Sequence, residues 1–323
     1  MSRAYLDAGQ TFLDDRFPLP LDAPFTAAQA RHEGVPAFEL TRLANAGFLR
    51  RPIQGVYVAA QVPDSLDLRA AAVRMVLPPG GVVTDRTAGW LHGASMILAP
   101  GDHLVVPRLS VFHRDRGERF RNDLMASGQR VMPDRHVTEL NGFAVTTPLR
   151  TVCDLGRLLP RTAALGAMDM LARLGLFAVA DVVAAVEQFR GYRWVTQLRA
   201  LAPLIDARSE SPAESVIRLR WLDLSDLPAP EPQRPVHRSS TTTYRLDVGN
   251  DELRFAVEYD GWEFHHTPEQ LEADRRRRRW IMENTDWIVR AVRRENVFGA
   301  RWDVDRVIRA GIIDARRRGR RAA

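Results

Sequence analysis

The sequence predicts a multidomain α/β protein of the α+β type, built from three blocks that each combine helices and strands. Two observations support this prediction. The chain has 323 residues, which is enough for two or three domains with cores of their own. Apolar residues recur at helical spacing in some segments and form short strand-like runs in others. We expect three blocks: residues 1–60, 61–207 and 208–323.

Block one is predicted to be a winged helix-turn-helix. Thr26 can cap a short helix, residues 34–36 break it, and apolar residues then recur at helical spacing from Phe38. Two strand-like runs, residues 48–53 and 55–59, close the block. In this interpretation three arginines face DNA phosphates: Arg42, Arg50 and Arg51. The alternative is a small helical packing module whose arginines are simply solvated.

Block two is predicted to be a mixed α/β scaffold that becomes helical after Pro148. Helices are expected at residues 66–77 and 86–92. Strands are expected at residues 103–106, 129–132 and 143–146. No chemical constellation stands out, and the scattered histidines are interpreted as packing residues: His92, His103, His113 and His136.

Block three predicts a mixed sheet flanked by helices. Serine, proline and glutamate within residues 209–214 mark a helix start. Two strands follow, with a turn expected at residues 249–251. A second helix opens with a capping box and a proline at residues 267–270 and runs to about Asn284. A buried strand at residues 287–292 completes the order helix, hairpin, helix, strand.

The positive charge of the chain is carried by arginine alone. The formal net charge is +6, and the sequence contains no lysine. Arginine stays protonated and forks onto phosphate oxygens, so mechanisms that need a catalytic lysine are excluded. Cys153 is the single cysteine, which excludes an intramolecular disulfide framework and a cysteine-based zinc site. With no signal pattern and no apolar run near the ~18 residues that a span requires, we expect a cytoplasmic protein without membrane contact.

A pair of carboxylates ends the second strand of block three. Glu258 and Asp260 are two positions apart on an apolar strand, so their side chains share a face. Asp247 ends the preceding strand, and five consecutive arginines follow at residues 275–279. Oxygen ligands for a hard cation beside dense positive charge predict chemistry on a polyanion. A tight turn at residues 250–251 would leave Asp247 about four residues short of Glu258, so a shared ion requires a wider loop or a bulge.

The ordered motifs of block three resemble a known domain family. They are Ser211-Pro-Ala-Glu214, Tyr244-Arg-Leu-Asp247, Ala256-Val-Glu258-Tyr-Asp260-Gly261, His265, Asp274-Arg275 and Trp287-Ile-Val-Arg290. Residues 208–300 resemble the endonuclease-like domain related to very-short-patch-repair (Vsr) endonucleases, of the restriction-endonuclease-like PD-(D/E)XK superfamily. Residues 20–157 more weakly resemble the winged-helix and following region of AbiEi-type antitoxin proteins. The resemblance implies a restriction-endonuclease-like fold in the C-terminal domain.

The same resemblance implies roles for individual residues. Asp247 and Glu258 match metal-binding acidic positions, and Glu214 matches the acidic residue of the first helix. Asp260 stands where the wider superfamily places lysine, and His265 is then the residue expected to position or deprotonate the attacking water. The implied catalytic set is Glu214, Asp247, Glu258, Asp260 and His265. The implied cofactor is Mg²⁺ or Mn²⁺, held by Asp247, Glu258 and Asp260.

Two functions remain open from the sequence. The first is a metal-dependent endonuclease that acts on duplex DNA. The second is a catalytically inactive DNA-binding regulator, of the kind found in toxin–antitoxin pairs, that uses the nuclease fold as a binding platform; RNA is a third, weaker alternative as the polyanion. The sequence does not identify a partner protein.

The five arginines at residues 275–279 would have a different role in each interpretation. It wraps around its helix, so about two of its members face the acidic strands. Arg277 or Arg278 would neutralise transition-state charge, and Arg275, Arg277 and Arg278 are predicted to bind DNA. In a purely structural alternative, Glu258 and Asp260 pair with Arg275 or Arg278 in an ion-pair network without catalysis. The basic residues 316–321 are interpreted as a disordered end with phosphate affinity.

Overall fold

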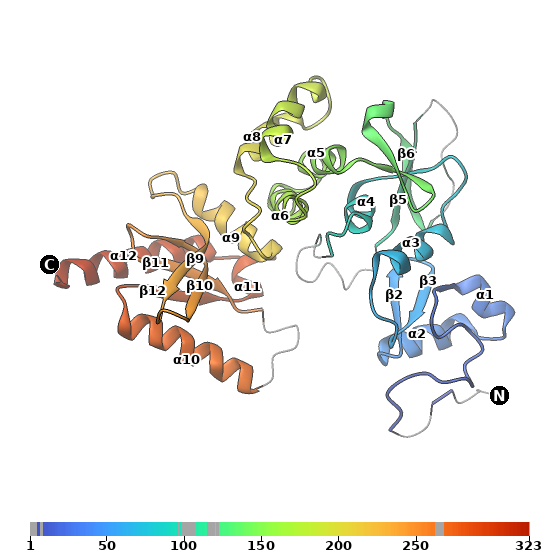
Figure 1. Cartoon of the computed structure of the whole chain (residues 1–323), viewed down its shortest axis with the longest axis horizontal. Coiled ribbons are helices and arrows are strands. Elements are labelled where there is room, and N and C mark those ends of the chain that lie inside the picture. Colours follow the sequence, from blue (N-terminus) through green and yellow to red (C-terminus); the bar gives the residue numbers. More distant parts are fainter. Residues whose placement is uncertain are drawn as a thin grey trace. The chain divides into compact units, whose positions relative to one another are not determined.

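The predicted α/β multidomain class is confirmed, because the described residues form three sheets with helices packed beside them (Figure 1). The computed structural model describes residues 5–6, 9–95, 97, 107–114, 120, 123–261 and 268–322. The chain divides into two compact units. The first contains residues 1–95 and 101–154, and the second contains residues 96–100 and 155–323.

The first unit begins with two helices and a small sheet. Thr26 caps α1 in a reciprocal capping box with Gln29, and Pro36 precedes α2. The elements are β1 (Phe25–Thr26), α1 (Ala27–His32), α2 (Ala37–Asn45), β2 (Leu49–Ile53) and β3 (Val56–Ala59). The strands are ordered β1-β3-β2 and pair antiparallel. The order helix, helix, hairpin is the order that the sequence predicts for a winged helix.

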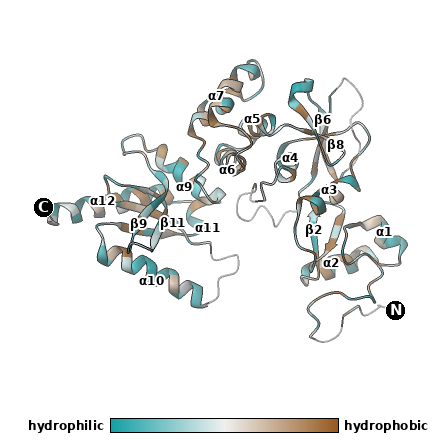
Figure 2. Ribbon diagram, in the orientation of Figure 1, coloured by the Kyte–Doolittle hydropathy of each residue, from teal (hydrophilic) through white to brown (hydrophobic). Residues whose placement is uncertain are grey.

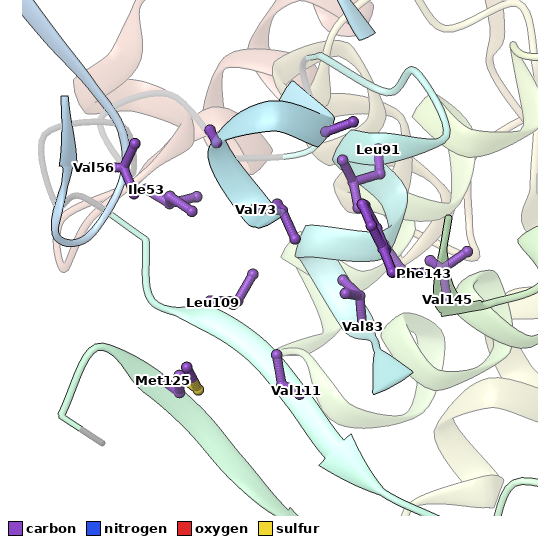
Figure 3. Close-up of a cluster of buried hydrophobic side chains, with 13 residues drawn as sticks. Ile53, Val56, Val73, Val83, Leu91, Leu109, Val111, Met125, Phe143 and Val145 are labelled. Atoms are coloured by element: carbon purple, nitrogen blue, oxygen red, sulfur yellow. The ribbon is translucent and has the colours of Figure 1, made fainter. Parts of the chain in front are cut away.

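A five-stranded mixed sheet forms the rest of the first unit. Its strands are β4 (Val82–Val83), β5 (Leu109–His113), β6 (Met125–Gln129), β7 (Val137–Leu140) and β8 (Phe143–Thr146), in the order β6-β5-β4-β8-β7. Apolar side chains of the strands pack against α3 (Leu66–Arg74) and α4 (Asp85–Leu91) (Figure 3). The strand expected at residues 129–132 is wrong, because β6 ends at Gln129 and lies earlier in the chain. The strand expected at residues 103–106 lies outside the described residues.

A buried ion-pair network joins the middle sheet to α5 (Pro148–Leu158). Asp154 is fully buried and receives a hydrogen bond of 2.7 Å from Arg150 and one of 3.2 Å from Arg130. Arg130 also binds Asp85 at 2.6 Å. Each buried charge therefore has a partner, which is the condition under which burial is tolerated. Nearby, His92 donates from Nε2 to the carbonyl of Thr146 at 2.7 Å, in keeping with a packing role.

Helices dominate the start of the second unit. They are α6 (Arg161–Ala172), α7 (Val179–Ala185), α8 (Val195–Leu201) and α9 (Pro212–Leu222). Helices α6 and α9 pack closely, because Gly166 leaves room for Pro212 and a Cβ at this glycine would lie 3.3 Å from it. Arg218 of α9 donates to the buried Asp169 of α6 at 2.7 Å. These contacts fix α9 before it meets the C-terminal sheet.

The C-terminal sheet is mixed and is covered by helices on both faces. Its strands are β9 (Glu231–His237), β10 (Thr243–Asn250), β11 (Phe255–Tyr259) and β12 (Ile288–Val292), in the order β12-β11-β10-β9. Helix α10 (Pro268–Asn284) connects β11 to its parallel neighbour β12. One core cluster contains residues of α9 and α12 (Val304–Ala322), and another contains residues of α10. Figure 1 shows α10 on one side of the sheet and α12 on the other.

The basic C-terminal end is helical, which corrects the expectation of a disordered tail. Helix α12 continues through residue 322. Ile308, Ile312 and Ala315 anchor its apolar face in the core, and Arg318 donates to the carbonyls of Met282 and Thr285, at the end of α10. Met282 lies in the last turn of α10 and Thr285 directly after it, where helix carbonyls run out of intrahelical donors, so Arg318 caps this end and holds the end of α12 in place.

Candidate functional site

The hairpin between β10 and β11 brings Asp247 next to Glu258. Asn250 pairs with Phe255 and Val248 with Val257, and the turn is formed by residues 251–254. Continuing this register places position 247 opposite position 258. The backbone N–H of Tyr259 donates to Asp247 at 2.8 Å. The tight turn considered from the sequence is therefore not formed, and the wider loop that a shared site requires is present.

A third carboxylate comes from the first turn of α9. Ser211 caps this helix through the backbone N–H of Glu214, and Pro212 occupies the first turn. The carboxylate of Glu214 accepts hydrogen bonds from the backbone N–H of Glu210, at 2.8 Å, and from Gln233, at 2.9 Å. Gln233 has a positive φ of 56°, a left-handed conformation within β9. The local backbone of β9 thus differs from a regular strand beside Glu214.

Burial raises the pKa of all three carboxyl groups, and charge repulsion adds to the effect at Asp247. Burial, followed by repulsion from Glu214 and Glu258, holds the pKa of Asp247 well above its usual range. Burial also raises the pKa of Glu214 and that of Glu258. Each group would be more stable with a proton or with a cation beside it. We call Glu214, Asp247 and Glu258 the acidic cluster.

Two arginines of α10 supply cations to the acidic cluster. Ile281 is fully buried, and Arg277 and Arg278 lie one turn before it on the same face of the helix. Arg277 forks onto Glu258, with 2.9 Å between Nη2 and Oε2 and 2.9 Å between Nη1 and Oε1. Arg278 lies 3.6 Å from Glu258 and 3.6 Å from Asp260. The pairing of Glu258 and Asp260 with Arg278, one of the alternatives from the sequence, is observed.

Other arginines of the run point away from the acidic cluster. Arg275 has an exposed side chain and lies 3.9 Å from Glu272 of its own helix, so it does not pair with the strand carboxylates. Arg276 and Arg279 are also exposed. Figure 2 shows α10 as largely hydrophilic. The five arginines therefore divide into an inward pair and an outward group of Arg275, Arg276 and Arg279.

The described carboxylates do not form a ligand shell for a metal ion. Within the described residues, no group of three or more His, Cys, Asp or Glu side chains has an arrangement that could hold one. The guanidinium of Arg277 donates to the carboxylate of Glu258, and the carboxylate of Asp247 accepts a hydrogen bond from the backbone N–H of Tyr259. Asp260 is mostly buried and its nearest cation is Arg278. His265, expected to act on water, lies outside the described residues.

Three predicted DNA-binding arginines of the first unit make intramolecular contacts. Arg42 forks onto the buried Glu39, at 2.9 and 2.6 Å, and keeps an exposed fraction of 52%. Arg50 donates to the carbonyl of Val62. The guanidinium of Arg51 lies 5.3 Å from the ring centroid of Tyr57. These contacts orient the three side chains, and Arg42 remains open to solvent.

Phe38 belongs to the apolar pattern of α2, but the structure places it outside the core. Its exposed fraction is 69%, whereas Leu40 and Leu43 are fully buried. Thr41 is exposed one turn further along α2. A large exposed aromatic residue near the start of this helix is a feature that the periodicity alone could not separate from the core.

A group of basic and aromatic side chains on the second unit was also missed. Arg238, in the turn between β9 and β10, donates to the hydroxyl of Tyr244 at 2.7 Å. Its guanidinium lies 5.3 Å from the ring centroid of Trp280 on α10 and 5.9 Å from that of Tyr244. The register of the strands brings the group together, because Tyr244 pairs with Val236 and places residue 238 beside the same strand end. The sequence carries no local signal for this register.

Comparisons with known proteins identify relatives of the chain. Residues 45–204 match the family model described as AbiEi antitoxin C-terminal domain. Two uncharacterized proteins of Mycobacterium tuberculosis, from strains CDC 1551 / Oshkosh and H37Rv, are each 32% identical over 256 residues. This similarity covers 77% of the chain and 89% of each mycobacterial protein. None of the described helices has the length and apolar character needed to cross a membrane.

Proposed function

We propose that this chain, which belongs to the same family as the two mycobacterial proteins, is a DNA-binding, antitoxin-like regulator. The observation that carries the proposal is the match of residues 45–204 to the AbiEi antitoxin C-terminal domain. That segment runs from the end of α2 through the five-stranded sheet and the helices up to α8. Helices α1 and α2 of the proposed winged helix precede the matched segment, its hairpin β2–β3 lies inside the segment, and the acidic cluster follows it.

The first unit offers a surface suited to duplex DNA. In a winged helix-turn-helix, the second helix of the motif enters the major groove, and residues near its N-terminus reach the base edges. The corresponding helix here is α2, with Phe38 and Thr41 exposed and Arg42 held by Glu39. An apolar ring suits the methyl group of thymine, and a guanidinium suits phosphate oxygens. We assign α2 as the element that reads DNA.

The second unit offers positive charge that binds phosphates without sequence preference. Arg275, Arg276 and Arg279 lie outward on α10, and Arg238 is stacked against Trp280. Stacking orients the guanidinium of Arg238 before a ligand arrives, which reduces the entropy lost on binding. In this role the C-terminal unit is a binding platform.

The test is DNA affinity measured by fluorescence anisotropy across a range of salt concentrations, with EDTA present. We expect binding of a short duplex that weakens steeply with salt. The double variant Arg276→Glu with Arg279→Glu should weaken binding to every duplex and reduce the salt slope by about 1 for each phosphate that the variant no longer binds. The matched control is Arg199→Glu on α8, a charge reversal on another helix of the same unit. Absence of binding at low salt, or equal losses in the variant and the control, would refute the proposal.

A second candidate function is metal-dependent hydrolysis of phosphodiesters in DNA. The observation that favours it is that Glu214 and Glu258 are buried, that Asp247 is half-buried on the strand paired with that of Glu258, and that all three have raised pKa values. Mg²⁺ or Mn²⁺ bound there would polarise a phosphoryl oxygen and activate water, and His265 is the residue proposed to orient that water. The described arrangement presents no ligand shell, so this candidate requires the side chains to rearrange.

Plasmid nicking separates the two candidates. Incubation with Mg²⁺ or Mn²⁺ is compared with EDTA, using the wild type and Asp247→Asn. Cleavage that needs the metal and is abolished in the variant, with DNA binding nearly intact, would support the nuclease. Intact plasmid under every metal condition, together with salt-sensitive binding, leaves the regulator.

A further inference from the structure

We infer that the guanidinium of Arg277 is the resident cation of the acidic cluster and that divalent cations are excluded while it pairs with Glu258. The cluster is defined above as Glu214, Asp247 and Glu258. The cation at this cluster of the second unit does not depend on whether the first unit binds DNA.

The position of Arg277 leaves no room for a metal ion at Glu258. Glu258 has an exposed fraction of only 1%, and its carboxylate already faces the guanidinium of Arg277 on α10. Both carboxylate oxygens lie 2.9 Å from a guanidinium nitrogen. A Mg²⁺ or Mn²⁺ ion would need to sit about 2.0–2.2 Å from such an oxygen, within the space of the guanidinium. The two cations therefore compete for one place.

Oε1 of Glu258 depends on the charge of Arg277. Oε1 forms an ion pair with Nη1, but no donor among the described residues is aligned for a hydrogen bond to it. Nη1 donates instead to the carbonyl of Arg245 at 3.1 Å. The contact of Oε1 is thus almost purely electrostatic. Removal of the guanidinium would leave a buried carboxylate oxygen that needs a cation, a proton or a hydrogen-bond donor.

The fold holds Arg277 in this place from two directions. Ile281, one turn later on α10, is fully buried and fixes the rotation of the helix. The carbonyl of Arg245 on β10 fixes the guanidinium itself. Arg278 adds a second positive charge 3.6 Å from Glu258 and 3.6 Å from Asp260. The carboxylates that would hold a divalent ion therefore already face two permanent charges, which repel a further cation.

The test is direct binding of Mn²⁺ to the full chain, followed by electron paramagnetic resonance of the free ion and by calorimetry. The variant Arg277→Gln keeps a polar side chain and removes the charge. The matched control is Arg276→Gln, which removes one charge from the exposed face of the same helix. We expect no Mn²⁺ binding at submillimolar concentration for the wild type and the control. Arg277→Gln should bind Mn²⁺ at least about tenfold more tightly, and adding Asp247→Asn should remove that binding.

Two results would overturn the inference. The first is Mn²⁺ binding by the wild type with the same affinity as Arg277→Gln. The second is a folded Arg277→Gln, verified by circular dichroism, that binds no Mn²⁺. If this variant fails to fold, the wild type decides alone: submillimolar Mn²⁺ binding that Asp247→Asn abolishes overturns the inference, and its absence supports it.

Discussion

Replacing Arg277 with alanine tests how strongly the acidic cluster depends on its internal cation. Glu258 has an exposed fraction of 1%, and Arg277 contacts both of its oxygens at 2.9 Å. Removing one partner of a buried ion pair costs about 3–5 kcal/mol, because the other charge stays buried. Arg278 remains 3.6 Å from the same carboxylate and offsets part of the loss. We therefore expect the free energy of unfolding of the second unit to fall by about 3 kcal/mol.

The origin of this loss can be separated with a second substitution. Glu258→Gln keeps the shape of the side chain and removes its negative charge. That charge would be buried without its main partner once Arg277 is replaced. The double variant Arg277→Ala with Glu258→Gln should therefore lose less stability than Arg277→Ala alone, with a coupling energy of about 1–3 kcal/mol. Urea unfolding followed by tryptophan fluorescence suits the measurement, because Trp221, Trp280 and Trp287 all report on the C-terminal sheet.

The pH dependence of Arg277→Ala has a defined sign. Burial already raises the pKa of Glu258 above its ordinary value of 4.5, and loss of the guanidinium raises this pKa further. A carboxyl group with a raised pKa in the folded state contributes stability that is fully present below the unfolded pKa. That contribution is lost as the pH rises through the folded pKa. The destabilisation by Arg277→Ala should therefore grow from acid to neutral pH. An equal loss of stability at acid and at neutral pH would refute the reasoning. An equal loss in the single and the double variant would refute it too.

Three further predictions, one with a control substitution, have equally defined outcomes. Asp247→Asn should stabilise the second unit at neutral pH, because burial raises the pKa of Asp247; the gain should vanish below the unfolded value of 3.8, as pH-dependent urea unfolding can show. Gly311→Ala should cost about 1–3 kcal/mol, since its Cβ would overlap the ring of Phe255, whereas Gly319→Ala, with open space around it, should cause no loss in thermal unfolding. Phe38→Ala should weaken DNA binding by about tenfold, which corresponds to ~1.4 kcal/mol. Its thermal unfolding should not change, because the ring is exposed. Fluorescence anisotropy and thermal melts test this, and unchanged binding with a lower melting temperature would contradict it.

Local signals in the sequence predicted much of the fold correctly. Thr26 and Gln29 form the capping box that begins α1, and Ser211 followed by Pro212 begins α9. These signals act within one turn of helix, so they can be identified without knowledge of the rest of the fold. The helix that ends at Asn284 was predicted from local signals as well, and the strand that follows it was predicted from its apolar run.

Features that depend on distant contacts were not predictable. The turn after β10 lies at residues 251–254, later than expected, and only this register brings Asp247 opposite Glu258. The ordered end of α12 depends on Arg318 reaching the carbonyls of α10, which are more than thirty residues away in the chain. Phe38 matched the helical period of the core, but periodicity does not say where the buried face of a short helix ends.

The five arginines at residues 275–279 show both what local signals predict and what distant contacts decide. The period of a helix already required that only about two of the five arginines face the strands. Which two depends on the burial of Ile281, a property of the assembled sheet. The positive charge beside the strand carboxylates comes from α10, where Arg277 donates a hydrogen bond to Oε2 of Glu258 and forms an ion pair with Oε1. A carboxylate cluster closed in this way can be stable without metal, and the outward arginines of the same helix remain available to phosphates.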